Sequence, residues 1–169
     1  MRSLRRTSVP DVAVGPGERV LAWCRTDDDR VLVGTRDALY VAGGDADART
    51  RIPWERVEAA DWDSETDVLR VSLVGSWGEQ RVEHALGLVE PGRLLELVRE
   101  RVTASVVLQR HVALSGRRGV RVIGRRAPRG DASIEWFYEY DEGVDPDDPA
   151  VRTAASEALA EARADVGST

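Results

Sequence analysis

Arginine side chains are concentrated in one stretch of this sequence, where they could bind phosphate or carboxylate groups. Seven arginines and no carboxylate lie between Ser105 and Gly130, although the chain of 169 residues has a formal net charge of −6. The residues that follow, 131–169, hold eleven carboxylates and two arginines. Such an asymmetry indicates a partner of opposite charge, which lies in another molecule or elsewhere in the same chain.

The strand pattern places these arginines on a two-stranded ribbon. In the segment Val120–Arg126, Arg121 and Arg125 point to one side, and other arginines mark the turns. The next predicted strand carries Glu135 and Glu139 on one face, so cross-strand pairs could neutralise part of the ribbon. The arginines expected to keep their charge uncompensated are those at the turns: Arg117, Arg118, Arg126 and Arg129.

Three explanations of the arginine stretch stay open: a solvated or self-paired face, a site for a protein partner, and a site for nucleic acid. Arginines on one face and at the tips of a ribbon could contact phosphates in a salt-sensitive way. No aromatic residue interleaves with them, which weakens the case for single-stranded RNA. All 24 basic residues of the chain are arginine, so the choice of arginine over lysine carries no information about the partner.

Trp77 is the other candidate contact residue. It lies in the predicted turn Gly75–Gly78, where an exposed tryptophan could anchor a partner. The alternative is that its ring folds back over the sheet. The candidate partner-binding residues are therefore Arg117, Arg118, Arg121, Arg125, Arg126, Arg129 and Trp77.

Catalytic and cofactor motifs are missing from the sequence. His84 and His111 are the only histidines, and no Gly-x-Ser-x-Gly nucleophile motif occurs. Neither phosphate-binding glycine motif, GxxxxGK[ST] or GxGxxG, is present. The sequence therefore predicts no enzyme activity and no cofactor.

One acidic stretch has the spacing of a calcium loop. Asp61, Asp63, Glu65 and Asp67 alternate as ligands would, but Thr66 stands where the loop needs glycine. A serine also occupies the position of the required bidentate glutamate. A polar turn explains the same residues, and no metal site is predicted.

The cysteine content and the hydropathy of the chain indicate the cellular compartment in which the protein is expected. Cys24 is the only cysteine, which excludes an intramolecular disulfide and favours a reducing compartment. The basic residues 1–6 are not followed by an apolar core, and no apolar run reaches the ~18 residues of a membrane span. We therefore expect a cytoplasmic protein.

Short strands with turn signals between them fill the first half of the chain. Their spacing predicts an antiparallel sandwich or partly open barrel of about seven strands. An amphipathic helix over 91–104 follows, with Leu94, Leu95, Val98 and Val102 on one face. The predicted strands are 20–24, 30–34, 38–41, 50–54, 57–62, 68–74 and 80–86.

The second half reads as three strands and a helix. The predicted strands are 105–114, 120–126 and 133–140, and Asp148 with Pro149 starts a helix that reaches about Asp165. The chain is thus α+β, with a flexible lead-in over 1–16, a β domain over 17–104 with its closing helix, and a β-β-β-α extension over 105–169.

About seven strands followed by one closing helix is the element order of the pleckstrin-homology-like superfold. The segment Arg51–Val57, the strand 68–74 and the helix 94–102 resemble those of bacterial PH-like domains, as in actinobacterial proteins of that type. The resemblance covers about residues 17–104 and implies a binding or assembly module. It does not extend to a basic lipid-binding loop, because the turn 27–29 consists of three aspartates.

The sequence therefore predicts a non-enzymatic module that acts by binding a protein partner in assembly or regulation. Nucleic-acid association through residues 117–129 is one alternative. Binding of a small molecule or lipid inside the β domain is the other. It requires an apolar cavity, which Trp23, Trp54 and Trp62 would fill if all three were core residues.

Overall fold

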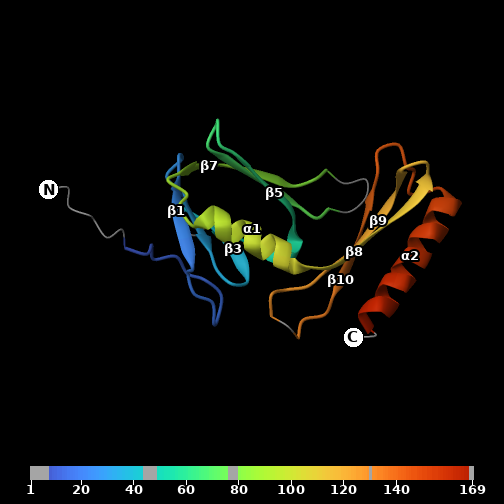
Figure 1. Ribbon diagram of the computed structural model, residues 1–169. Coiled ribbons are helices and arrows are strands. Elements are labelled where there is room, and N and C mark those ends of the chain that lie inside the picture. Colours follow the sequence, from blue (N-terminus) through green and yellow to red (C-terminus); the bar gives the residue numbers. More distant parts are fainter. Residues whose placement is uncertain (1–7, 44–48, 76–79, 130, 168–169) are drawn as a thin grey trace.

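The computed structural model describes residues 8–43, 49–75, 80–129 and 131–167 (Figure 1). These residues form an α+β protein with a seven-stranded antiparallel sheet, a three-stranded antiparallel sheet and a C-terminal helix. The α+β class and the order of elements predicted from the sequence are confirmed.

The first sheet is built by consecutive strands of the chain. Its strands are β1 (Ala22–Thr26), β2 (Val31–Gly34), β3 (Ala38–Ala42), β4 (Arg49–Pro53), β5 (Val57–Asp63), β6 (Val68–Leu73) and β7 (Glu83–Val89). They lie in the order β4-β3-β2-β1-β7-β6-β5. β1 and β7 pair at only two positions, Arg25–Val89 and Thr26–Leu88, so a narrow ladder joins a four-stranded half to a three-stranded half. A 3-10 helix, η1 (Trp54–Arg56), connects β4 to β5.

The second sheet follows the first helix. The remaining elements are α1 (Leu94–Ser105), β8 (Val106–Ser115), β9 (Arg118–Arg125), β10 (Glu135–Tyr140) and α2 (Pro149–Gly167). The strand order is β10-β9-β8. α2 packs over β8 and β9, with Ala158 and Ala162 buried against Val122. Small side chains on α2 let the helix lie close to the sheet.

α1 packs against the first sheet, and its apolar side chains join the main core. Leu94 and Val98 are buried together with residues from both halves of the sheet. Gly34 in β2 permits the close approach, because a Cβ there would lie 2.6 Å from Leu97 Cδ2. No helix in the described part of the chain combines the length and hydropathy needed to cross a membrane.

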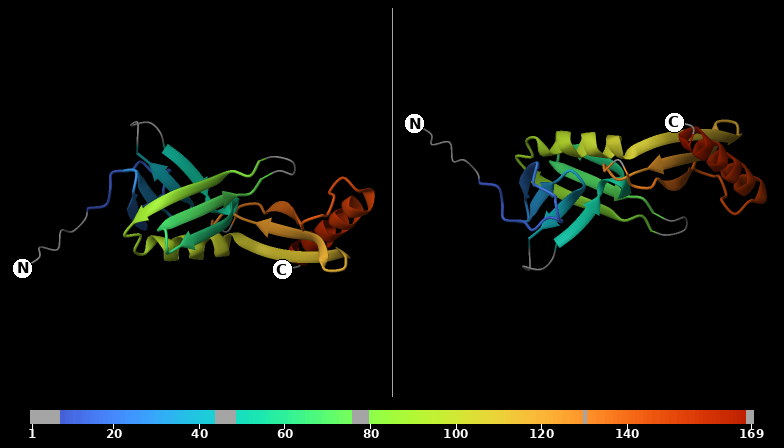
Figure 2. Two further views of the ribbon diagram at one scale, coloured as in Figure 1. Left: turned by 90° about the horizontal axis from the view of Figure 1, so that it is seen from above. Right: turned by 90° about the horizontal axis from the view of Figure 1, so that it is seen from below.

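The chain passes from α1 into β8 without an intervening residue. α1 ends at Ser105 and β8 begins at Val106, and the Ser105 hydroxyl donates a hydrogen bond to the Val102 carbonyl over 2.7 Å. The β8 strand leads away from the first sheet, so the second sheet and α2 lie at the opposite end of the molecule from β1 (Figures 1 and 2).

Two element boundaries differ from the sequence prediction. The helix predicted from residue 91 begins only at Leu94, because Glu90 and Gly92 both have φ of 50°. That left-handed conformation is incompatible with a right-handed helix. The strand predicted over 80–86 runs instead from Glu83 to Val89, and Leu86 and Leu88 are its buried residues.

Residues of the predicted lead-in pack against the first sheet, on the face opposite the main core. Val12 and Val14, together with Val20, contact the buried side chains of Val33 and Tyr40. Beneath them lies Glu18, whose carboxylate is almost fully buried. It accepts hydrogen bonds from three side chains: Thr35 Oγ1 (2.6 Å), Tyr40 OH (3.0 Å) and Arg51 Nη2 (2.9 Å).

This buried carboxylate predicts a loss of stability in acid. Burial raises the pKa of Glu18, but the hydrogen bonds from Thr35, Arg51 and Tyr40 outweigh it and hold the pKa below the usual 4.5. A carboxylate whose pKa is lower in the folded state than in the unfolded state stabilises the protein at pH values above its unfolded-state pKa. This stabilisation is lost as the pH falls through the folded-state pKa. Denaturant titrations are repeated at a series of pH values from neutral downward. The free energy of unfolding should fall more steeply with pH for the wild type than for Glu18→Gln. Glu157→Gln, on the exposed face of α2, should follow the wild type, and parallel curves for all three proteins would contradict the prediction.

Candidate functional site

Four of the seven clustered arginines contact other parts of the chain. Arg110 lies against α2, with Nη1 2.6 Å from Glu161 Oε2 and Nη2 2.5 Å from Asp165 Oδ2. Arg121 donates to Glu139 Oε2 over 3.0 Å, which confirms the cross-strand pairing expected from the sequence. These contacts hold α2 and β10 to the ribbon.

Arg125 is buried between the two sheets. Only 4% of the residue is exposed, and its guanidinium donates to Ser105 Oγ over 3.0 Å and to the Glu58 carbonyl over 3.3 Å. Burial lowers the pKa of this arginine. Glu135, its cross-strand neighbour, pairs instead with Arg56 of η1. The expected neutralisation of the ribbon by Glu135 is therefore wrong.

Arg129 reaches back to the first sheet. Its Nε lies 3.1 Å and its Nη2 2.7 Å from Asp37 Oδ2, in the turn between β2 and β3. The hydrogen bond from Arg129 holds the pKa of Asp37 below its usual range. Next to this pair, Arg36 Nη2 donates to the Pro128 carbonyl over 3.4 Å. The prediction that the turn arginines stay uncompensated is thus wrong for Arg129.

The remaining candidate residues are not brought together by the fold. Arg117 and Arg118 are exposed at the turn between β8 and β9, whereas Arg126 is half-buried at the far end of β9. The backbone N–H of Arg126 donates to the Ser105 carbonyl over 2.9 Å. Trp77 lies outside the described residues. The ribbon therefore offers no continuous arginine surface.

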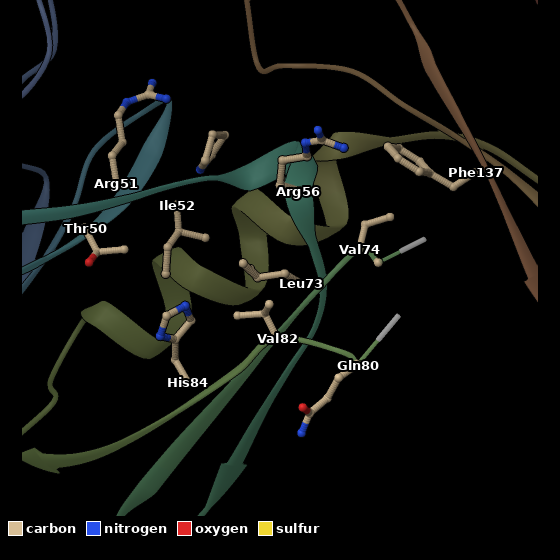
Figure 3. A pocket seen from close by; sticks show the side chains of 12 residues that line it. Thr50, Arg51, Ile52, Arg56, Leu73, Val74, Gln80, Val82, His84 and Phe137 are labelled. Carbon is tan, nitrogen blue, oxygen red and sulfur yellow. The ribbon is translucent and has the colours of Figure 1, made fainter. Parts of the chain in front are cut away.

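A groove lies along one side of the first sheet, where Phe137 of the second sheet reaches its end, and we call it the junction groove (Figure 3). Its volume is about 430 Å³. One wall is β4, the other is formed by the end of β6 and the start of β7, and η1 and β10 each contribute a side chain at one end. The lining residues are Thr50, Arg51, Ile52, Pro53, Arg56, Leu73, Val74, Gly75, Gln80, Val82, His84 and Phe137.

The junction groove runs along the outer edge of β4. Residues 50–53 all line it, although successive side chains of a strand point to opposite faces. A surface in contact with four consecutive residues must therefore follow the edge of the strand. β4 is the terminal strand of the first sheet, so on this side no described strand pairs with its backbone.

The walls of the junction groove are apolar and partly exposed. Val82 is 54% exposed although it is a β-branched apolar residue. Ile52 is buried below it, and Leu73 and Phe137 are half-buried. Figure 3 shows Arg56 and Phe137 together at one end and Thr50 toward the other, with Val82 between. An apolar side chain from another molecule would find contacts here.

Among the described residues that line the junction groove, the ionisable side chains are Arg51, Arg56 and His84. Arg51 is already bound, because it donates to Glu18 over 2.9 Å and to the Tyr40 hydroxyl over 3.0 Å. Its guanidinium points away from Val82 and His84 (Figure 3). Arg56 is less constrained: it lies 3.4 Å from Glu135 and above the Phe137 ring, 5.8 Å from the centroid.

A second open groove lies between α1 and the strands β5 and β6. Trp62 and Leu69 form one side and Leu95 the other, and the volume is about 410 Å³. Trp62 is therefore not an interior residue, in contrast to Trp54, which is fully buried in the main core. Trp23 packs on the other face of the first sheet, so one of the three tryptophans fills the interior.

The remaining chemical motifs have structural explanations. Asp63, from the calcium-like stretch, accepts backbone hydrogen bonds from Glu65 (2.9 Å) and Thr66 (3.3 Å) within a turn. Among the residues that the structure describes, no three metal-ligating side chains gather into a cluster. His111 contacts Asp141 over 2.9 Å, far along the chain from His84.

The sequence did not predict the junction groove. Val82 lies within the predicted strand 80–86, but in the structure β7 begins at Glu83 and Val82 is exposed. Comparison of the chain with family models, with curated proteins and with solved structures found no match.

Proposed function

We propose that this chain is a non-enzymatic protein-binding module, which holds an extended segment of a partner in the junction groove. One observation carries the proposal: the groove follows the free edge of β4 and has exposed apolar walls. Extended peptides bind such edges by adding a strand, with backbone hydrogen bonds for affinity and side-chain contacts for specificity.

The strand order supports a PH-like assignment for residues 17–104. A four-stranded half and a three-stranded half, joined through β1 and β7 and followed by α1, match the element order of that superfold. In this proposal α1 is the closing helix, and residues 105–169 are an extension that completes the groove with Phe137. The single cysteine, Cys24, is buried, which supports a cytoplasmic location.

The placement of the arginines favours a protein partner over nucleic acid. Phosphate binding requires several arginines with accessible guanidinium groups. Arg110, Arg121 and Arg129 are ion-paired within the chain, and Arg125 is buried. The arginine stretch thus supports internal docking of the extension rather than a nucleic-acid surface.

A display selection with a library of random linear peptides tests the proposal. The wild type should enrich a common motif, and Val82→Glu should abolish enrichment because it buries a charge under the bound peptide. Val89→Glu is the matched control: Val89 is 48% exposed, lies at the end of β7, the strand that follows Val82, and does not line the junction groove. An equal loss in both variants, or no motif with the wild type, would refute the site.

Strand addition has a further signature. N-methylation of alternate amides in an enriched peptide should abolish binding in one of the two alternating sets and leave the other set much less affected. The reason is that only every second amide of an edge strand faces its neighbour. Equal tolerance of both sets would show that the peptide does not pair with β4.

A further inference from the structure

Arg56 lines the junction groove and forms a long ion pair. Its distance of 3.4 Å to Glu135 is longer than the 2.7 Å of the Arg129–Asp37 pair and the 2.9 Å of the pair between Arg51 and Glu18. Charge-assisted hydrogen bonds normally fall at about 2.7–2.9 Å. Arg56 and Glu135 are also half exposed, at 50% and 51%, so water competes for both groups.

The surroundings of Arg56 suit a second carboxylate. None of the described residues that line the junction groove is acidic, so the part of the wall that they form offers no like charge to an incoming anion. The Phe137 ring lies under the guanidinium and keeps it in place through its π-face. The bidentate geometry of a guanidinium also leaves room for a carboxylate ligand in the plane of its N–H groups.

We infer that the junction groove selects partner segments carrying an aspartate or glutamate, whose carboxylate replaces Glu135 at Arg56. This inference rests on the proposed function. Glu135 occupies the position in the free protein and neutralises Arg56 until the partner arrives. The neighbouring apolar side chain of the segment then packs on Val82 and Leu73, which line the same groove as Arg56 and Phe137 (Figure 3).

If a partner carboxylate displaces Glu135, substitutions at Arg56 and at Glu135 should change the affinity for an acidic peptide in opposite directions. Arg56→Gln removes the cation and should weaken binding of an acidic peptide about tenfold, the scale of a hydrogen bond to a charged group. Glu135→Gln removes the internal competitor and should strengthen binding about threefold, the scale of an exposed ion pair. A purely structural role for the Arg56–Glu135 pair would make both variants weaker.

The probes are the most enriched peptide from the display selection and the same peptide with its acidic residue changed to the amide. Affinities for both peptides are measured by calorimetry with the full chain, its Arg56→Gln and Glu135→Gln variants, and the control Arg117→Gln. Arg117 is exposed at the β8–β9 turn and does not line the groove. The amide peptide should bind wild type and Arg56→Gln equally, and only the acidic peptide should weaken as salt is added.

Failure of this inference is distinct from failure of the proposed function. Enriched peptides without an acidic residue, or a Glu135→Gln variant that binds more weakly, would overturn the inference and leave the groove as a peptide site. A wild type that enriches no motif would overturn the proposed function itself. Thermal unfolding of each variant confirms that these exposed substitutions leave the fold intact.

Discussion

Trp54→Ala is expected to lower the free energy of unfolding by about 3–5 kcal/mol, the range for large aromatic truncations in cores. Trp54 is completely buried at the start of η1, where the first sheet turns from β4 into β5. Its indole Nε1 donates to the Thr35 carbonyl over 3.1 Å. The substitution therefore leaves a cavity and also a buried carbonyl without its side-chain donor.

Denaturant titration of the full chain measures this loss. Trp54→Phe is the matched variant, because it keeps an aromatic ring but removes the donor to Thr35, and it should lose less than half as much stability as Trp54→Ala. Because Trp54 adjoins the groove residues Pro53 and Arg56, peptide binding should weaken in step with the loss of stability. An alanine variant as stable as the wild type would show that Trp54 does not support the junction of β4 and β5.

Gly119→Ala is expected to unfold or displace the second sheet. The free energy of unfolding should fall by about 3 kcal/mol, the upper end of the range for overpacking. A Cβ on Gly119 would lie 1.8 Å from the Val112 carbonyl oxygen. Gly119 pairs with Ala113 of β8, next to a register shift between Ala113 and Ser115, and the β8 backbone lies against it. A backbone oxygen cannot rotate away as a side chain would.

Hydrogen exchange separates this effect from a global one. The amides of β8, β9 and β10 should lose protection, and peptide binding should fall because β10 supplies Phe137 to the groove. Gly167→Ala is the matched control, since a Cβ there meets nothing within 4 Å, and it should exchange like the wild type. Undiminished protection of β9 in Gly119→Ala would contradict the steric argument.

The order of elements could be predicted because it depends on local signals. Apolar alternation marks the strands, and turns such as 63–67 separate them. Element ends were less predictable where backbone conformation decides them: the helix predicted from residue 91 begins only at Leu94, because Glu90 and Gly92 are left-handed. Nothing in the residue types of that segment announces a positive φ at Glu90.

The roles of the arginines were only partly predictable. The Arg121–Glu139 pair follows from strand register alone, and the sequence indicated it. The Arg129–Asp37 pair joins residues 92 positions apart, so it depends on how the second sheet sits against the first. Strand register likewise makes Glu135 the cross-strand neighbour of Arg125. In the structure, however, the Glu135 carboxylate pairs with Arg56, which lies far from it along the chain.

The junction groove could not be derived from the sequence, because its walls come from segments that only tertiary packing brings together. Ile52, Val82 and Phe137 each look like ordinary strand residues when read along the chain. In the structure they line one groove beside the edge of β4, with Val82 exposed above the buried Ile52. Prediction of such a site needs the relative position of the two sheets, which is set by buried contacts such as that of Arg125.

The direct passage from α1 into β8 gives Ser105 two roles in placing the second sheet. No loop residue separates Ser105 from Val106, and the Ser105 hydroxyl accepts a hydrogen bond from Arg125 of β9 over 3.0 Å. Arg125 also donates to the Glu58 carbonyl of β5. Substitutions at Ser105 or Arg125 should therefore alter the junction groove through the position of Phe137, although neither residue lines it.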